Sequence, residues 1–219
     1  DDHHWTRRCH ADLVRDTAHR DLAQTGESTR ADHDQVDLSN LQRQIIHHEA
    51  DLGEPKALSA RATLAAINPG CEVIAKDWQL DDDELREEIR RADAVLDCTD
   101  NFASRFLLNR LAVEERTALI SGAAIRLEGQ LMVSLPGGAP CYECVYPGDL
   151  AAEESCAMEG ILAPVVGVIG TMQALYAIRV LTGRHDAIRG TLVLFDAINM
   201  EWRKIRVPPR PDCPVCGRP

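Results

Sequence analysis

Residues 93–101 read Asp-Ala-Val-Leu-Asp-Cys-Thr-Asp-Asn, and this stretch decides the fold class. Its first six residues form a compact apolar run, as expected of a parallel strand that is buried on both faces. Residues 99–101 form a turn, and an amphipathic helix is predicted over 102–115 with Phe106, Leu107 and Leu111 pointing inward. A buried strand, a turn and a helix in this order are typical of α/β proteins.

The same alternation continues toward the N-terminus. A helix is predicted over 56–67, because apolar residues recur there at helical spacing before the Pro69-Gly70 stop. A strand is predicted over 71–75. The next helix, 81–91, opens with three aspartates, whose charge suits the positive end of a helix dipole.

The pattern changes toward the C-terminus, after a predicted strand at 118–121. The run 130–135 leads into the turn at Pro136 with no crossover helix, which indicates an antiparallel strand. We therefore predict an α/β fold with a Rossmann-like, mostly parallel sheet and antiparallel C-terminal strands. The remaining predicted elements are a helix over 167–181, with Met172, Leu175, Ile178 and Leu181 on one side, and strands over 191–195 and 202–207.

Four of the eight cysteines form two C-x2-C pairs, Cys141 with Cys144 and Cys213 with Cys216. Two such pairs supply the four thiolates of a tetrahedral zinc site, and a site closed in this way is structural. The 68 residues 145–212 separate the pairs, so the fold has to bring them together. The alternative is two independent redox pairs or unpaired thiols.

Length and charge limit the class of protein. The 219 residues, 45% of them hydrophobic, suffice for one sizeable core. A net charge of −11 disfavours a general nucleic-acid binder, since phosphate neutralisation needs a basic face. We see no run of the roughly 18 apolar residues that a membrane span requires and no start resembling a secretory signal, so we expect a soluble protein without membrane association.

Six polar residues, spread over the sequence between positions 32 and 100, are candidates for a nucleotide site. Two of them are cations of the kind that a triphosphate requires, and one is a carboxylate at the end of the strand 93–98, where an open α/β sheet holds ligands or a metal ion. On spacing alone, a solvated surface explains each charged member better. The set is Asp32, Asn40, Arg43, Gln44, Lys56 and Asp100.

Taken together, the motifs of residues 32–219 resemble those of the E1-like adenylyltransferases of the MoeB/ThiF type. No single motif is specific, but their joint occurrence in this order is. They are Asp37-Leu-Ser-Asn-Leu-Gln-Arg-Gln44, Gly53-x-Pro-Lys56, Asp97-Cys-Thr-Asp-Asn101, Ser121-Gly-Ala-Ala124, Glu128-Gly-Gln130, Cys141-Tyr-x-Cys144 and Pro164-Val-Val-Gly-Val-Ile-Gly170.

The resemblance implies an ATP- and Mg²⁺-dependent enzyme that adenylates the C-terminal glycine carboxylate of a ubiquitin-like sulfur carrier, ThiS-like or MoaD-like. It implies a cytoplasmic homodimer with a structural Zn²⁺. By motif, Asp32 would hold the ribose, Asp100 would bind magnesium, and Asn40, Arg43 and Lys56 would contact the phosphates, with Gln44 beside them. Arg43, Lys56 and Asp100 would serve catalysis, which needs cations on the departing pyrophosphate.

Cys156 resembles the loop cysteine of this family, which takes part in sulfur or thioester chemistry in some members and is dispensable in others. A thiolate at this position could attack the acyl-adenylate. The neighbouring Glu153 and Glu154 would raise the pKa of the thiol and so disfavour the thiolate.

Residues 1–31 depart from the family pattern. We find no strand in them and no G-x-G-x-x-G loop, the element that cradles nucleotide phosphates in the family. We therefore divide the chain into a non-matching, disordered segment 1–31 and an adenylyltransferase domain 32–219 whose sheet lacks its first strands. Either the start of the sequence is a misread or frame-shifted translation, which the abrupt change at Asp32 favours, or the loop has been lost.

Two functions remain in competition. The first is the adenylyltransferase, and the second is a non-catalytic module that binds the carrier but has lost ATP binding. A Rossmann dehydrogenase is disfavoured, because the glycine fingerprint and a catalytic His or Tyr constellation are both missing from the sequence.

Overall fold

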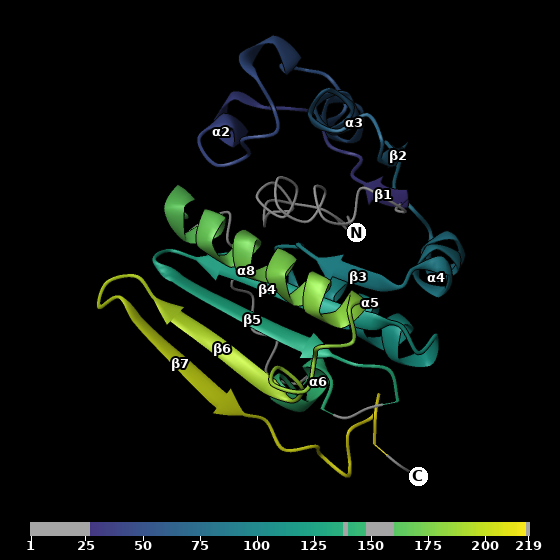
Figure 1. Cartoon of the computed structure of the whole chain (residues 1–219), viewed down its shortest axis with the longest axis vertical. Coiled ribbons are helices and arrows are strands. Elements are labelled where there is room, and N and C mark those ends of the chain that lie inside the picture. The colour runs from purple at the N-terminus through teal and green to yellow at the C-terminus, as the bar shows by residue number, and fades with distance from the viewer. Residues whose placement is uncertain (1–26, 138–139, 148–159, 218–219) are drawn as a thin grey trace.

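The computed structural model of the chain describes residues 27–137, 140–147 and 160–217, which form a mixed α/β fold (Figure 1). Its strands fall into a parallel pair and a five-stranded sheet of order β3-β4-β5-β6-β7. The pair consists of β1 (Glu27–Ala31) and β2 (Glu72–Lys76). The sheet consists of β3 (Ala94–Asp97), β4 (Ala118–Ile125), β5 (Glu128–Ser134), β6 (Thr191–Asp196) and β7 (Glu201–Arg206).

The sheet changes from parallel to antiparallel at β5, as the sequence predicts. Strands β3 and β4 pair in parallel, whereas β5, β6 and β7 each pair antiparallel with the strand before them. Ile125 faces Glu128 across the β4–β5 pair, so only two residues form the loop between these strands. A loop of that length can join only antiparallel neighbours.

The helices α3, α4, α5 and α8 end within one residue of the predicted positions, although α8 begins four residues earlier than predicted, and the short helices α2, η1 and α6 were not predicted. Asp81 caps α4 by accepting hydrogen bonds from the backbone N–H groups of Asp83 and Glu84, and this cap fixes the residue at which the helix begins. The helices are α2 (Leu38–Leu41), η1 (Glu49–Asp51, a 3₁₀ helix), α3 (Lys56–Ile67), α4 (Asp82–Arg91), α5 (Phe102–Glu114), α6 (Tyr142–Val145) and α8 (Ala163–Leu181).

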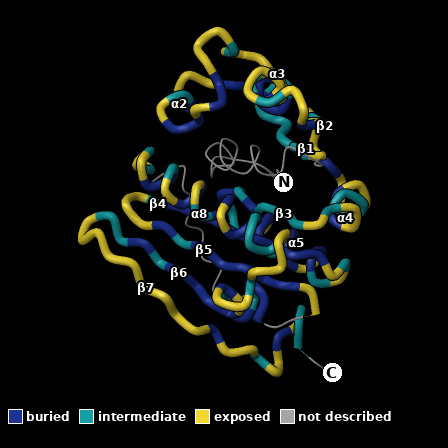
Figure 2. Tube along the Cα trace, in the orientation of Figure 1, coloured by how far each residue is buried: buried dark blue, intermediate teal, exposed yellow. Residues whose placement is uncertain are grey.

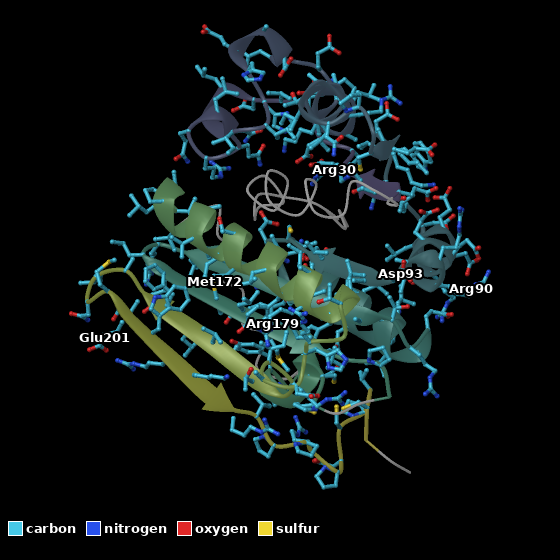
Figure 3. The ribbon with its side chains drawn as sticks, viewed as in Figure 1. Arg30, Arg90, Asp93, Met172, Arg179 and Glu201 are labelled. Carbon is cyan, nitrogen blue, oxygen red and sulfur yellow. The ribbon has the colours of Figure 1, made fainter. Side chains whose placement is uncertain are left out.

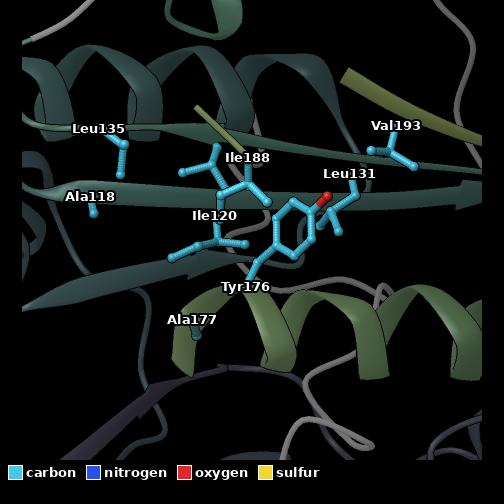
Figure 4. Packing of buried hydrophobic residues seen from close by; sticks show 9 residues of the cluster. Ala118, Ile120, Leu131, Leu135, Tyr176, Ala177, Ile188 and Val193 are labelled. Atoms are coloured by element: carbon cyan, nitrogen blue, oxygen red, sulfur yellow. The ribbon is translucent and has the colours of Figure 1, made fainter. Parts of the chain in front are cut away.

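Helix α8 covers one face of the sheet, and α4 and α5 cover the other. Because strand side chains alternate between faces, Ile120 of β4 packs with Tyr176 of α8, while the adjacent Leu119 packs with Leu111 of α5. Figure 4 shows the cluster on the α8 side, in which Tyr176 lies against Ile120 and Leu131. The sheet is therefore buried on both faces at its centre.

Burial falls toward β7, whose six residues are all exposed (Figure 2). Strand β3 is also less buried than expected, since Ala94, Val95 and Leu96 are only partly covered. Among the described strands β3 pairs with β4 alone, so it lies at an edge of the five-stranded sheet. The prediction of a strand buried on both faces is therefore wrong for most of β3.

The prediction that residues 1–31 contain no strand is also wrong. Residues 27–31 form β1, which pairs in register with β2 from Glu27 opposite Glu72 to Ala31 opposite Lys76. The stretch is polar, and pairing with β2, together with the packing of Ala31 beside the Leu85 and Leu111 cluster, stabilises it as a strand. Among the described residues no strand joins β1 to β3, so the parallel pair and the five-stranded sheet are separate sheets.

Helix α8 corrects two further predictions. Its buried side carries Ile169, Gln173 and Tyr176, whereas Leu175 and Leu181 on the predicted apolar side are exposed. Figure 3 shows Met172 and Arg179 along this helix. At 19 residues α8 is also long and apolar enough to cross a membrane, so the prediction that no such segment exists is wrong. However, 44% of its most apolar stretch is buried inside the protein, as is common for long core helices.

For α5, the inward face is formed by Leu108 and Leu111, with Phe106 and Leu107 only half-buried. The first turn of α5 also buries Arg105, whose guanidinium donates to the Thr99 carbonyl oxygen just after β3.

Candidate functional site

The segment between β1 and α3 carries most of the predicted nucleotide-site residues. Lys56 opens α3, and its ammonium group lies 2.9 Å from the Asp34 carboxylate, with only 4% of the side chain exposed. The Lys56 backbone N–H also donates to the Asp34 carbonyl oxygen at 2.8 Å. Asp32 accepts a hydrogen bond from the Asp34 backbone N–H at 3.0 Å, which closes the turn after β1. These contacts hold a buried cation at the end of the parallel pair.

Asn40, Arg43 and Gln44 lie on and just after α2, and all three are buried. The Asn40 side chain accepts from the Asp37 backbone N–H in a capping box, so part of its role is local. Arg43 donates to the Ser39 carbonyl oxygen at 2.9 Å. Within the described structure, Gln44 Oε1 is buried and accepts no hydrogen bond, which leaves it available to a ligand.

A polar relay fastens this segment to α3. The Ser59 hydroxyl donates to Asp51 Oδ2 at 3.0 Å and lies 2.8 Å from His47 Nδ1, from which it accepts. Thr63 adds a bond to the Ile46 carbonyl oxygen at 2.8 Å. The pKa of the Asp51 carboxyl is lowered, chiefly by the backbone N–H of His48 and also by Ser59. The relay fixes Arg43 and Gln44 relative to the helix that begins at Lys56.

Asp100 lies at the carboxyl end of β3, as the sequence predicts. It is close to the carboxylate of Asp97, which is held by several hydrogen bonds. Asp97 accepts from the Thr99 backbone N–H, the Thr99 hydroxyl and the Ser121 hydroxyl at 2.7 to 3.0 Å. The Arg105 guanidinium donates to the Thr99 carbonyl oxygen at 2.7 and 3.2 Å. The turn 99–101 is therefore held rigidly, with the Asp100 carboxyl beside it.

Asp100 opens into a cavity of about 290 Å³ between α5, α6 and the sheet. The sheet contributes small residues such as Ala123 and Gly129 and also larger ones, among them Leu194 of β6. The sequence analysis did not predict most of the residues that line this cavity. Gln130 lies in a quoted motif and Tyr146 follows one, but no sequence pattern indicated Arg105. The polar and aromatic walls are Asp100, Phe102, Arg105, Glu128, Gln130, Tyr146, Phe195, Asp196 and Arg203.

The structure does not place all six predicted nucleotide-site residues around this one cavity. Arg43 lines a second, more open depression together with Ile45 and the first half of α8, including Pro164 and Val168. Cys156 lies outside the described residues.

The four cysteines of the C-x2-C pairs do come together. Their sulfur atoms all lie within 4.8 Å of one another, with Cys141 3.7 Å from Cys213 and Cys144 3.4 Å from Cys216. Burial raises the pKa of Cys141 to about 11 and also raises that of Cys216. Burial is also the largest single influence on Cys213, but hydrogen bonds from the backbone of Cys216 and Val215 and from the neighbouring thiols together lower its pKa. An all-sulfur set at this spacing fits a tetrahedral zinc ion, whose charge would stabilise the thiolates.

Residues 22–215 match the ThiF family. The chain belongs to this family. The match includes β1 and so begins before the first of the quoted motifs at Asp37. The predicted boundary between residues 31 and 32, like the individual residue roles, remains a prediction.

Two of the relatives in this family are enzymes of Escherichia coli (strain K12). The molybdopterin-synthase adenylyltransferase is 43% identical over 199 residues, which are 90% of this chain and 79% of the relative. The sulfur carrier protein ThiS adenylyltransferase is 41% identical over 196 residues, 89% and 78% of the two chains. The chain is thus of the MoeB/ThiF adenylyltransferase type, as the resemblance implied.

Two longer proteins match over only part of their length. The adenylyltransferase and sulfurtransferase MOCS3 of Drosophila ananassae is 43% identical, but the chain spans only 42% of that protein. A crystal structure of Escherichia coli MccB with ATP superposes with a TM-score of 0.78 at 20% identity, covering 93% of this chain and 63% of MccB. At that identity MccB supports the fold alone.

Proposed function

We propose that this chain adenylates the C-terminal glycine carboxylate of a ubiquitin-like sulfur carrier, using ATP. The observation that carries the proposal is the match to two sulfur-carrier-pathway adenylyltransferases at more than 40% identity over about nine-tenths of the chain. One relative acts in molybdopterin synthesis and the other on ThiS, so a MoaD-like and a ThiS-like carrier are both candidates. The reaction would take place in the cytoplasm, in a homodimer.

In the proposed reaction, a carboxylate oxygen of the carrier attacks the α-phosphorus of ATP. The bond from that phosphorus to the bridging oxygen breaks, pyrophosphate leaves, and an acyl-adenylate forms. Asp32 would hold the ribose, while Asn40, Arg43, Gln44 and Lys56 would bind the phosphates. Both cations are buried, which strengthens their interaction with the departing charge.

The carrier tail would enter the cavity at Asp100, whose carboxylate offers the hard oxygen ligand that Mg²⁺ prefers. Bound magnesium would offset negative charge on the phosphates. Arg105 and the backbone around Thr99 would keep the Asp100 turn in place. Cys156 would be available to accept the activated acyl group, a role that we propose on the family resemblance alone.

Pyrophosphate exchange tests this proposal. Labelled pyrophosphate should enter ATP only when a ThiS-like or MoaD-like carrier is present, and Asp100→Asn should reduce the exchange at least a hundredfold. Asp93→Asn is a matched control at the exposed opposite end of β3 and should exchange like the wild type. No exchange with either carrier would contradict the proposal.

A second function is favoured by one specific observation, the lack of a G-x-G-x-x-G loop anywhere in the sequence. Without that phosphate cradle the chain could bind a carrier and activate nothing. Calorimetric titration separates the two functions. Carrier binding with no heat from millimolar Mg-ATP supports the binding module, whereas saturable ATP binding supports the enzyme.

A further inference from the structure

Gln173 is a buried amide on the covered side of α8. Only 1% of the residue is exposed, and the residues one turn before and after it, Ile169 and Ala177, are apolar and also buried. Burying an amide costs free energy unless its N–H and C=O groups find partners. A glutamine at this position therefore depends on hydrogen bonds that an apolar side chain could not make.

The Gln173 amide finds these partners at the end of β3 and in β4. Its Nε2 donates to the carbonyl oxygens of Asp97 and Ile120, at 2.8 Å each. Its Oε1 accepts from the Cys98 thiol at 3.5 Å. Asp97 is the last residue of β3, so the amide joins the two strands to α8 at the point where β3 ends.

Gly122 of β4 leaves the space that this amide occupies. A Cβ on Gly122 would lie 2.8 Å from Gln173 Oε1 and 3.0 Å from its Cδ, which is too close for non-bonded atoms. Any larger residue at this position would displace the amide. The glycine and the glutamine therefore fit each other across the contact between β4 and α8.

The bond from Gln173 to Asp97 holds the start of the turn that carries Asp100. Asp97 precedes Asp100 by three residues. Arg105 of α5 holds the same turn from the opposite face of the sheet, through the Thr99 carbonyl oxygen. The position of the Asp100 carboxylate therefore depends on α8 as well as on α5.

Helix α8 also borders the segment that carries Arg43. Gly167 and Met172, the residue before Gln173, line the open depression together with Arg43. In the proposed reaction Asp100 and Arg43 act on one nucleotide, so their relative position matters for the rate. A single helix thus borders one of these parts of the chain and is hydrogen-bonded to the other.

We propose that Gln173 is a positioning residue for Asp100, and that it fixes the turn after β3 in the place where the Asp100 carboxylate meets magnesium. The inference rests on the proposed function. It adds a residue that touches neither ATP nor the carrier and acts through the Asp97 backbone.

The first test measures the turn itself and needs no enzyme activity. Gln173→Met keeps a long, unbranched side chain and removes all three hydrogen bonds. The Thr99 backbone N–H, which donates to Asp97 Oδ1, reports opening of the turn. Its hydrogen–deuterium exchange, followed by nuclear magnetic resonance, should become about tenfold faster in Gln173→Met.

Asn109→Leu is the matched control, because it removes another buried amide. Asn109 is fully buried in α5, accepts from the Tyr142 backbone N–H at 2.9 Å and donates to Cys141 Sγ at 3.5 Å. Both substitutions should lower the urea midpoint of unfolding. Only Gln173→Met should accelerate exchange at Thr99, whereas a merely structural role for Gln173 predicts the same rate in both variants.

The second test measures the magnesium requirement of pyrophosphate exchange. In Gln173→Met the Mg²⁺ concentration that gives half-maximal exchange should rise about tenfold, while KM for the carrier stays within about twofold of the wild-type value. Asn109→Leu should keep the wild-type magnesium requirement. If Gln173→Met does not fold, Gly122→Ala displaces the amide without removing it and should change both readouts in the same direction.

The outcomes separate this inference from the proposed function. A folded Gln173→Met or Gly122→Ala protein with wild-type exchange at Thr99, or with an unchanged magnesium requirement, overturns the role of Gln173 alone. Failure of the wild type to exchange pyrophosphate with either carrier overturns the proposed function and the link to magnesium. The hydrogen exchange of the Thr99 amide still decides, in that case, whether Gln173 holds the turn.

Discussion

Lys56 combines full burial with a charge, and its neighbours explain how both are tolerated. The Asp34 carboxylate lies 2.9 Å away and is itself one-fifth exposed, so the pair stays partly solvated. Replacing Lys56 by Met should remove the nearest compensating charge from that partly buried carboxylate. We expect a loss of about 2 to 3 kcal/mol in the free energy of unfolding, measured by urea denaturation, and loss of pyrophosphate exchange.

Lys76→Met is the matched control for this change. Lys76 pairs with Glu88 at 3.2 Å, and about one-fifth of each side chain is exposed. We expect its removal to cost less than about 1 kcal/mol and to leave exchange intact. Equal effects of the two substitutions would show that the buried position of Lys56 has no special role.

The Asp51 carboxylate should make stability depend on pH in acid solution. Its pKa in the folded protein lies below the ordinary value of 3.8, mainly because the His48 backbone N–H donates to it. Its stabilisation is therefore fully present above about pH 3.8 and is lost as the pH falls through the lower pKa of the folded state. Asp51→Asn should lower the melting temperature at pH 7, and the difference from wild type should shrink below pH 3.8.

Asp186→Asn provides the comparison, because 99% of that side chain is exposed. Its melting temperature should follow that of the wild type at every pH. If the difference between Asp51→Asn and wild type stays constant down to pH 2, the relay between His47, Ser59 and Asp51 does not stabilise the ionised carboxylate.

The contact between β5 and α8 depends on a glycine. A Cβ at Gly129 would lie 2.4 Å from Ile169 Cγ1 and 2.5 Å from Cδ1, so the helix must shift or the isoleucine must change rotamer. Gly129→Ala should destabilise the protein by about 1 to 3 kcal/mol, measured by urea denaturation. Adding Ile169→Val removes the Cδ1 atom and should recover part of that loss. Additive effects in the double variant would contradict this packing explanation.

The sequence predicts most elements here because their signals are local. The three aspartates that open α4 and the lack of a crossover helix after the run 130–135 are signals of a few residues, and the predicted helix and the predicted antiparallel strand are both confirmed. The strand at Glu27 was missed, since its polar residues form a strand only through pairing with β2. The buried face of α8 was misjudged because the helix is apolar nearly all round, and contacts with the sheet decide which side is covered.

The candidate site was predictable to different degrees for the same reason. Asp100 follows a recognisable strand, and the cysteines follow a recognisable spacing, so both were located from the sequence. Arg105 and Tyr146 line the cavity only because α5 and α6 pack against β5, and no short-range sequence pattern predicts that packing. Family motifs place Lys56, but its partner Asp34 lies outside every quoted motif.

For the molecule as a whole, the cysteine cluster joins distant parts of the chain. Cys213 and Val207 of the C-terminal segment pack with Cys141, Met132 of β5 and Leu192 of β6 in one buried cluster. Among the described strands β7 is exposed throughout, so this cluster is a principal attachment of the segment that follows it. Zinc bound by the four sulfurs would stabilise the folded state, since the unfolded chain does not hold a preformed site.

We therefore expect a chelator to lower the melting temperature of the zinc-loaded protein, measured by calorimetry with metal content determined in parallel. Cys213→Ser should lower it without a chelator and abolish most of the further decrease, because one of four ligands is lost. Cys71→Ser, a buried cysteine outside the cluster, should lose some stability from burying a hydroxyl but keep the full response to the chelator. If the wild type loses its zinc with no change in melting temperature, the cluster does not clamp the C-terminal segment, and the stabilisation of that segment must come from its apolar contacts with β5 and β6.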